Sequence, residues 1–382
     1  MQSLIDNKPA ERSEELRRNI PNEGMPEMHT DGPDLSWFEF MPAWVMYTPV
    51  VIQSIIMAIR YRSLTLPLAA NPGIHLSGMV GESKTAILSL ARGKARDYIL
   101  PFITLNRSRE RSTEAFSRSK ERLIASGLNY PVVAKPDMGC RGAGVRLIKN
   151  DSDLQRYMED FPKEQDFLLQ EKAPWSAEVG IFYTRYPDSS RGKIISMGFK
   201  YIPFVVGDGV TTLRGLIESD SRAEKLSHIY FSRFENRLDE VLPDGEVLNL
   251  VFSGSHSKGA IFRNGNEYIT EALTRKLDEV LADVPGFFFG RLDVKFRTIT
   301  SLMAGKDFTI IELNGASSES VHIWDNKSTY VGAVKMLLKQ YRILYEIGDQ
   351  QRKAGHNVPT LSELFKAWRQ ERALTVKYPS TD

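Results

Sequence analysis

The chain has 382 residues, of which 42% are hydrophobic and 26% are charged, and its mean hydropathy is -0.30. This composition excludes a disordered chain and a membrane protein with several spans, and the length predicts two or three domains. The 50 Lys and Arg residues nearly balance the 48 Asp and Glu residues, so the net charge of +2 predicts no nucleic-acid partner. Cys140 is the only cysteine, which excludes an intrachain disulfide and a Cys-rich zinc site and favours a cytoplasmic location.

Residues 1–36 are rich in Pro, Asn, Asp and Glu and predict a flexible leader. They contain no apolar segment of the kind that a signal peptide needs, and their acidic residues are untypical of a transit peptide. Residues 37–100 follow as a predicted N-terminal domain.

The most apolar run of the chain lies at 43–59 and is followed by the sequence Arg-Tyr-Arg. The run contains Pro49 and Gln53 and is shorter than the roughly 20 residues of a membrane-spanning helix. We therefore favour a helix that is buried in the core or at a subunit interface, such as that of a homodimer. A helix that lies on a membrane surface is the alternative.

From residue 84 onward, short apolar runs alternate with helical patterns. Strands are predicted at 102–105, 131–135, 145–148, 167–172, 178–183, 193–199, 287–296 and 307–313. Helices are predicted at 84–96, 111–126, 151–158 and 268–282 and from 330 onward. This order favours an α+β fold built from subdomains over a single doubly wound α/β sheet.

A glycine-rich turn separates two of the predicted strands. Strand 131–135 ends in Lys135, and Gly139, Gly142 and Gly144 follow before the next strand begins. The backbone N–H groups of such a loop can fold over phosphate oxygens, while the lysine adds a fixed positive charge. Taken alone, the loop fits a plain hairpin better, because a glycine turn between two strands is more often just a hairpin. The spacing of its glycines is the reverse of the dinucleotide motif, and the segment Gly81-Glu-Ser-Lys84-Thr85 lacks the adjacent Gly and Lys of a P-loop.

Acidic and amide side chains lie in two late strands. Arg291 and Asp293 are two residues apart, as are Glu312 and Asn314, so each pair points to one face of its strand. Two carboxylates and an amide are hard oxygen ligands, which suit magnesium that bridges phosphates. A structural ion pair is an equal alternative, because buried carboxylates need a counter-charge of some kind.

A third segment joins two predicted strands. Glu171 and Lys172 end one strand, and Glu178 begins the next. A strand end can present backbone groups to the edge of adenine, and a nearby carboxylate can accept the ribose hydroxyls. On its own, this segment is not specific for a nucleotide.

Together and in this order, the three segments resemble the ATP-grasp superfamily, most closely its D-alanine-D-alanine ligase branch, and the GDG segment at 207–209 is similar to that of cyanophycin synthetase. The resemblance covers residues 84–325. It implies two α+β subdomains that clamp ATP, a small lid subdomain at 101–175 and a C-terminal subdomain at 176–340. The N-terminal domain would precede them, and a helical tail at 341–382 would follow.

The resemblance also implies roles for individual residues on the lid side. Lys84 and Lys135 would contact the phosphates of ATP. The glycine loop would close over them as a lid, and its contributing residues would be Gly139, Cys140, Arg141, Gly142 and Gly144.

At the rim of the site, the resemblance implies that Glu171 and Lys172 contact the adenine and that Glu178 binds the ribose. The family often donates a backbone N–H two residues after the lysine, where this chain has Pro174, which carries no N–H. Ala173 would therefore donate in its place.

On the side of the larger subdomain, Lys200 would approach the nucleotide phosphates, and Arg291 would steady the transferring phosphoryl group. Asp293, Glu312 and Asn314 would hold Mg²⁺ as two ions, for which Mn²⁺ is an alternative.

The activity that the resemblance implies is an ADP-forming carboxylate-amine ligase that works through an acyl phosphate. Its partners would be a small-molecule carboxylate and an amine, such as an amino acid or a small peptide. An ATP-grasp phosphotransferase and a nucleotide-binding scaffold at a membrane or a protein partner are the alternatives. The loop at 315–325 differs from that of familiar ligases, so the identity of the substrates does not transfer.

Overall fold

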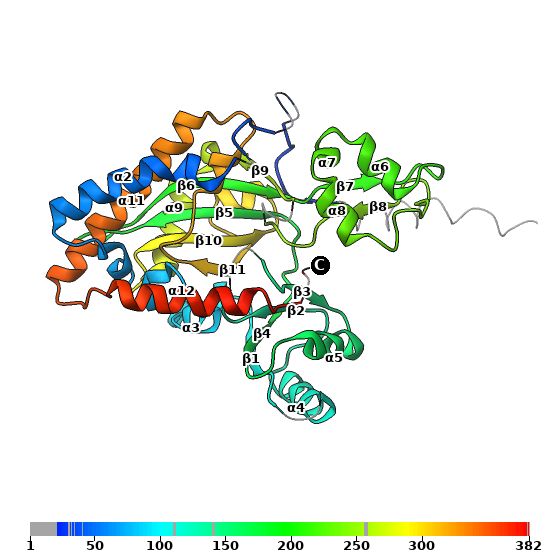
Figure 1. Ribbon diagram of the computed structural model, residues 1–382, viewed down its shortest axis with the longest axis horizontal. Coiled ribbons are helices and arrows are strands. Elements are labelled where there is room, and N and C mark those ends of the chain that lie inside the picture. Colours follow the sequence, from blue (N-terminus) through cyan, green and yellow to red (C-terminus); the bar gives the residue numbers. More distant parts are fainter. Residues whose placement is uncertain are drawn as a thin grey trace, which may run out of the picture.

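The structure is a computed structural model that describes residues 21–382, with the exception of 30, 32, 34, 40, 110, 111, 140, 141, 256–258, 380 and 382. Most of the predicted leader, residues 1–20, therefore lies outside the described residues. The described chain folds around two antiparallel sheets with helices packed against them, which confirms the predicted α+β class (Figure 1).

The smaller sheet has four antiparallel strands in the order β1-β4-β2-β3, with the bounds Phe102–Asn106, Asp166–Glu171, Val132–Pro136 and Arg146–Ile148. Helices α4 (Ser112–Ala125) and α5 (Asp151–Asp160) pack against it through one hydrophobic core. In that core, the rings of Tyr157, Phe161 and Phe167 lie 5.2–5.4 Å apart. Each fully buried apolar side chain of this size stabilises the packing by about 1.5–3 kcal/mol.

The larger sheet has five antiparallel strands in the order β11-β10-β5-β6-β9, with the bounds Phe308–Asn314, Phe289–Phe296, Glu178–Thr184, Lys193–Tyr201 and Ile261–Asn264. Helix α9 (Glu271–Ala282) packs its buried leucines on one face, and Thr270 caps its first turn by accepting from the N–H of Leu273. Helix α11 (Tyr330–Lys353) packs on the opposite face. Short helices complete the edges of this layer: η5 (Asn266–Tyr268), α10 (Ile299–Met303) and η6 (Val321–Trp324).

An additional unit between β6 and β9 has a hydrophobic core of its own. It consists of β7 (Phe204–Val206), α6 (Leu213–Ser219), α7 (Ser221–Lys225), α8 (Ser227–Arg233) and β8 (Val247–Asn249). The sequence predicted no element here, because helices of five to seven residues are too short to show a helical period.

The region before the smaller sheet consists of short helical turns: η1 (Leu66–Ala69), η2 (His75–Gly78), α3 (Lys84–Leu88) and η3 (Gly93–Tyr98). The predicted continuous helix at 84–96 is therefore wrong. Gly93 has a φ of +45°, in the left-handed region, and this backbone conformation interrupts a right-handed helix.

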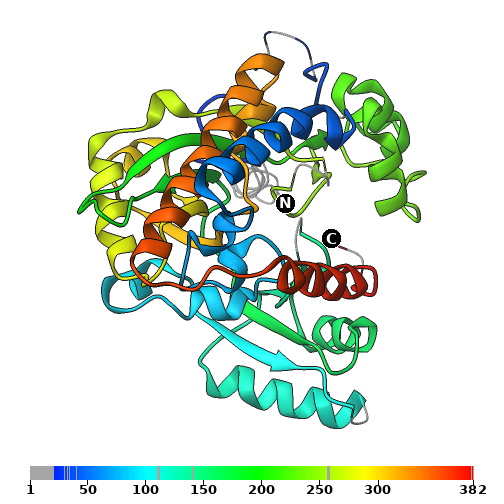
Figure 2. The ribbon, with the colours of Figure 1, turned by 60° about the vertical axis from the view of Figure 1, so that its left-hand side comes forward.

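Helix α2 (Ala43–Tyr61) corresponds to the apolar run and packs along α11 (Figures 1 and 2). The prediction of a helix buried in the core is wrong, because only Met46, Val50 and Met57 of α2 are buried. Among the described residues, α2 is the one helix that is long and apolar enough to span a membrane, and 17% of its apolar window is buried. Its outer face remains available for an interface.

The C-terminal part of the chain returns to the smaller sheet. Helix α11 runs without a break across residue 340, where the sequence predicted a boundary, and α12 (Leu361–Thr375) follows. Thr360 and Glu363 close a capping box at the start of α12. Figure 2 shows α12 in red next to the subdomain of the smaller sheet.

Candidate functional site

Strands β10 and β11 carry the acidic and cationic side chains that the sequence singled out. The two strands pair so that Asp293 lies opposite Glu312 and Arg291 lies opposite Asn314. Directly opposed residues of an antiparallel pair share one face of the sheet. All four side chains therefore point to the same side, as their spacing in the sequence requires.

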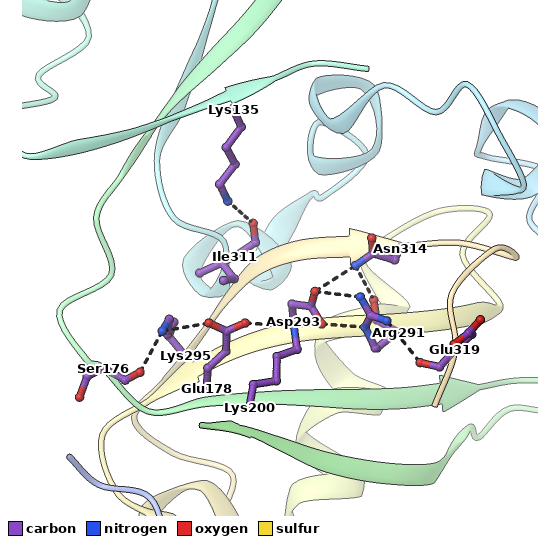
Figure 3. Close-up of polar contacts among 10 residues, drawn as sticks. All are labelled: Lys135, Ser176, Glu178, Lys200, Arg291, Asp293, Lys295, Ile311, Asn314 and Glu319. Atoms are coloured by element: carbon purple, nitrogen blue, oxygen red, sulfur yellow. Dashed lines mark hydrogen bonds and ion pairs between the residues drawn. The ribbon is translucent and has the colours of Figure 1, made fainter. Parts of the chain in front are cut away.

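Lys200, on β6, which β5 separates from β10, lies at the centre of a buried ion network (Figure 3). Its Nζ is 2.9 Å from Oδ1 of Asp293 and 3.0 Å from Oε1 of Glu178. Arg291 donates from Nε to Oδ1 of Asp293 at 2.8 Å and from Nη2 to Oδ2 at 3.1 Å. Lys295 approaches Oε2 of Glu178 to 3.0 Å. Each buried carboxylate therefore has two cationic partners.

The network fixes the ionised state of its members. Burial alone would raise the pKa of Glu178, but Lys295 and Lys200 outweigh it and hold the pKa at about 2. Burial also opposes ionisation of Asp293, and its cationic partners nevertheless keep its pKa below the usual range. Burial would lower the pKa of Lys200, whereas the attraction of the two carboxylates raises it.

Two glycines give the network its space. A Cβ at Gly180 on β5 would lie 3.1 Å from Cδ of Arg291 and 3.5 Å from Cε of Lys200. A Cβ at Gly254 would lie 2.6 Å from Oε1 of Glu178, which is closer than real Cβ atoms approach. A larger residue at Gly254 would therefore displace the carboxylate or the loop that covers it.

Lys135 reaches from the smaller sheet across to the larger one (Figure 3). Its Nζ donates to Oε1 of Gln170 at 2.7 Å and to the carbonyl oxygen of Ile311 on β11 at 3.2 Å. In the described part of the chain, no carboxylate forms an ion pair with Lys135, and burial lowers its pKa. An anion bound in front of this side chain would supply the missing counter-charge.

Lys84 begins helix α3 and faces the same space. Its Nζ donates to the carbonyl oxygen of Gly139 at 2.6 Å and lies 3.5 Å from Oε1 of Glu312. The loop after β2 is tied to this helix, since Asp137 accepts from the backbone N–H of Lys84 at 2.9 Å. The two lysines predicted to contact phosphate thus meet on one side of the site.

The glycine loop lies next to Lys84. Gly139 and Gly142 line the site, while Gly144 does not and packs against Pro136 instead. All three glycines have positive φ values, from +69° to +140°, which only glycine adopts readily. The other two predicted members of the lid, Cys140 and Arg141, lie outside the described residues.

The C-terminal segment forms hydrogen bonds with this loop through residues 378 and 381. The sequence did not predict this contact. The hydroxyl of Tyr378 donates to the carbonyl oxygen of Met138 at 2.6 Å. Thr381 donates from Oγ1 to the carbonyl oxygen of Gly142 at 2.7 Å and accepts from the N–H of Gly144 at 3.2 Å. The position of the loop therefore depends on the end of the chain.

These elements surround a cavity of about 1270 Å³ between the two sheets. Most of the predicted site residues line it: Lys84, Lys135, Gly139, Gly142, Glu171, Lys172, Ala173, Glu178, Lys200, Arg291, Asp293, Glu312 and Asn314. The cavity is larger than the roughly 300–1,000 Å³ of ordinary small-molecule sites. It has room for a nucleotide together with a second ligand.

A cationic cluster faces one part of this cavity. Its cations are Lys84, Lys135, Lys200, Arg291 and Lys295, and the carboxylates that pair with them are Glu178, Asp293 and Glu312. The rest of the lining is mainly acidic, with Glu23, Glu39, Glu82, Glu171, Glu319 and Glu371 beside Lys172 and Arg297. Phosphate oxygens therefore fit the cationic cluster, and not the cavity as a whole.

At the rim, Glu171 and Lys172 are exposed at the end of β4, and Ala173 follows them. Glu178, which was predicted to bind ribose, is buried instead, and both of its oxygens are engaged by lysines. Glu171 is therefore the better placed carboxylate for a hydroxyl-bearing ligand at this rim.

Helix α12 forms a wall of the cavity that the sequence analysis missed. Phe365 and Trp368 line the cavity and are 57% and 44% exposed. Nearby, Oε2 of Glu82 is buried and has no hydrogen-bond partner among the residues that the structure describes, and burial above all raises the pKa of Glu82 to about 7. Lys295 was also missed, although its position two residues after Asp293 places it on the same strand face.

The predicted metal ligands fit a magnesium ion by their chemistry. Asp293 and Glu312 supply two carboxylates in register, and Asn314 adds an amide on the same face. Within the described ranges, no cluster of three or more His, Cys, Asp or Glu residues suited to a metal is present. The set therefore suits an ion that a phosphate ligand helps to coordinate, rather than a closed protein cage.

No protein-family model matches the chain, and no curated protein matches its sequence. Solved structures similar to it include the bifunctional glutathione synthetase from Pasteurella multocida, with 14% identity and a TM-score of 0.34. That match covers 67% of this chain and 36% of the synthetase, so the chain spans about a third of the length of that protein.

Two further solved structures are similar over most of their length. The D-alanine-D-alanine ligase from Bacillus anthracis has 10% identity and a TM-score of 0.39, with 74% of this chain and 72% of that chain covered. The D-cycloserine synthetase DcsG has 12% identity and a TM-score of 0.36, with 70% of each chain covered. All three are ATP-grasp proteins, the superfamily that the motifs resemble. At these scores, the likeness carries no argument about activity, which rests on the site itself.

Proposed function

We propose that this chain is an ATP-dependent ligase that joins a carboxylate to an amine and releases ADP and phosphate. The observation that carries the proposal is Lys135, which forms no ion pair among the described residues and bridges the two sheets opposite the network of Lys200, Arg291 and Asp293. Such an arrangement is suited to hold a polyphosphate between two subdomains.

The proposed reaction needs charge neutralisation and positioning more than a nucleophilic side chain. The γ-phosphoryl group of ATP passes to a substrate carboxylate oxygen, which gives an acyl phosphate and ADP. The amine nitrogen then attacks the acyl carbon, phosphate leaves, and the nitrogen loses a proton. Lys200 and Arg291 would stabilise the negative charge on the transferred group, because both side chains are held in place by Asp293.

The lid side would hold the rest of the nucleotide. Lys84 and Lys135 would contact phosphate oxygens, and Gly139 and Gly142 would approach them through the backbone. Glu171 and Lys172 would lie beside the base and the sugar.

Magnesium would be held by Asp293, Glu312 and Asn314, where it would neutralise phosphate charge, and manganese is the alternative ion. The substrates would be a small-molecule carboxylate and amine, for which the cavity offers room beside a nucleotide. We place the reaction in the cytoplasm, where ATP is available.

The double variant Asp293→Asn with Glu312→Gln tests this proposal. It removes both proposed carboxylate ligands while keeping side-chain size, so we expect ATP-dependent ADP release to fall at least about a hundredfold. The matched control is Asp239→Asn with Glu267→Gln, which changes the same two residue types at exposed positions. Unchanged ADP release in the first variant, with the control also active, would refute the proposed site.

A further inference from the structure

Helix α2 presents a large apolar face to the outside of the molecule. Six of its side chains are at least half exposed, with exposed fractions from 53% to 74%: Trp44, Val51, Ile52, Ile55, Ile56 and Ile59. Over about four helical turns, they form a ridge about 22 Å long. Among the residues that the structure describes, no segment covers this ridge. Contiguous apolar surface of this extent marks an interaction site.

The ridge points directly away from the protein. The buried residues Met46, Val50 and Met57 lie on the opposite side of the helix, where α2 packs on α11. At 100° per residue, Ile55 is about 180° from Met46 and about 160° from Met57 in the helical projection. The apolar residues of the ridge therefore have no role in the contact with α11.

Polar contacts fasten α2 along its inner side. Gln53 donates from Nε2 to the carbonyl oxygen of Leu338 at 2.7 Å. Tyr330 and Tyr345 of α11 donate from their hydroxyls to the carbonyl oxygens of Val45 and Ser54 at 2.8 and 3.1 Å. Because these contacts run along most of its length, α2 lies on the surface of the protein as a fixed element. It can rest in the plane of a bilayer without leaving its fold.

The border of the ridge is basic. Helix α2 contains no Asp or Glu and has Arg60 in its last turn, and Arg62 follows the helix. Helix α11 lies along α2 (Figure 1). Its residues Lys335, Lys339 and Arg342 are exposed at helical spacing, so they form a basic stripe on α11.

The acidic residues of α11 are turned toward other partners. Glu346 accepts from the hydroxyl of Tyr186, and the carboxylate of Asp349 is paired with Arg352 and Lys353. Glu346 also lies 3.8 Å from Nε of Arg342, so the charge of this arginine is partly balanced and the stripe rests mainly on Lys335 and Lys339. The surface around the ridge is thus apolar in its centre and cationic at its edge.

We propose that the outer face of α2, together with the basic stripe of α11, docks this protein on an anionic lipid bilayer. An apolar helix face enters the boundary between head groups and acyl chains, while lysines and arginines at its edge reach lipid phosphates. Trp44 lies at one end of the ridge, and tryptophan is enriched at this depth of a membrane. A second copy of the chain fits less well, because a symmetric contact would bring two basic stripes together. The proposal does not depend on the reaction proposed for the cavity.

Vesicle flotation of the full chain tests the docking surface. We expect the protein to float with vesicles of phosphatidylcholine and phosphatidylglycerol, and to float far less with phosphatidylcholine alone. Changing Lys335→Gln or Lys339→Gln is expected to weaken binding to the anionic vesicles about fivefold each. High salt is expected to weaken it as well, since the lipid charge is screened.

The variant Ile52→Glu with Ile55→Glu places two charges in the centre of the ridge. We expect it to lose flotation while its melting temperature and its affinity for an ATP analogue stay at the parent values. The matched control is Ile124→Glu with Val210→Glu, which changes exposed apolar residues at 66% and 81% exposure on other parts of the surface. The control is expected to float like the parent chain.

Three results would overturn the proposal. The first is flotation that the Ile52→Glu and Ile55→Glu changes leave intact. The second is a full chain that never floats and forms a dimer in light scattering that these changes dissociate, which would assign the ridge to a second copy. The third is flotation that appears only after residues 2–20 are deleted, which would assign the ridge to the N-terminal segment.

Discussion

Replacement of Lys135 by Met separates ligand binding from stability more sharply than any other change in the cavity. The methionine keeps the apolar stem but removes the charge and the two hydrogen bonds to Gln170 and Ile311. Those hydrogen bonds are worth about 1 kcal/mol each, and their loss is offset because a buried cation without an acidic partner is also removed. We therefore expect the free energy of unfolding to stay within about 1 kcal/mol of the parent value.

The affinity for nucleotide is expected to change much more. A charge-assisted hydrogen bond from Lys135 to phosphate is worth about 1.5–3 kcal/mol, so the Kd should rise about 10- to 150-fold. Calorimetry with a non-hydrolysable ATP analogue and Mg²⁺ measures the affinity, and denaturant unfolding measures stability.

Two matched variants serve as controls for Lys135→Met. Lys295→Met removes a cation that is already paired with Glu178, so we expect a smaller loss of affinity and a larger loss of stability. Lys163→Met, at an exposed position of the smaller subdomain, is expected to change neither quantity. If Lys135→Met bound the analogue as tightly as Lys163→Met, the assignment of Lys135 to phosphate would be refuted.

Three further predictions concern the walls of the cavity. Because the pKa of Glu82 is raised from 4.5 to about 7, its ionisation opposes folding as the pH rises through this window. Glu82→Gln is expected to match the parent at pH 4 and to exceed it by about 3 kcal/mol at pH 8 in denaturant titrations, and equal differences at both pH values would contradict this. Tyr378→Phe removes the hydrogen bond to Met138, so we expect faster hydrogen exchange in the glycine loop and a Kd for nucleotide about 2- to 10-fold higher. Unchanged exchange would show that Tyr378 does not hold the glycine loop in place. Gly142→Val is expected to weaken ATP binding in calorimetry, because Gly142 has a φ of +71° and its Cβ position lies 3.3 Å from Oγ of Ser253. An unchanged Kd would remove Gly142 from the lid.

Local sequence pattern was sufficient for eight of the eleven described strands, β1–β6, β10 and β11, and for several of the polar residues that line the cavity. The alternation of side chains placed Arg291 with Asp293 and Glu312 with Asn314, and the pairing of β10 with β11 brings the four together. The sequence could not show which charges pair. Glu178 lies 22 residues before Lys200, and their contact depends on the register of β5 and β6.

Contacts between residues that are far apart in the chain could not be predicted from the sequence. Tyr378 and Met138 are 240 residues apart, and nothing in either segment indicates that the end of the chain braces the loop. The unit between β6 and β9 was missed because its helices are short and its strands have three residues each.

The apolar run shows a different limit of sequence reasoning. Its composition predicted a helix correctly, but composition does not say how much of a helix its neighbours cover. Because α11 offers one face only, Met46, Val50 and Met57 are buried and the isoleucines opposite them are not. The burial of each α2 side chain depends on which elements pack against the helix, and the amino-acid pattern of α2 does not indicate those elements.

The most direct test of the proposed ligase is the mass of its product. Amino acids and dipeptides are screened in pairs for those that stimulate ADP release, and active mixtures are analysed by mass spectrometry. A ligase gives ADP, phosphate and a product whose mass equals the two substrates less one water, and Lys135→Met lowers its yield. A product that carries a phosphoryl group and no second substrate would contradict the ligase and indicate a phosphotransferase.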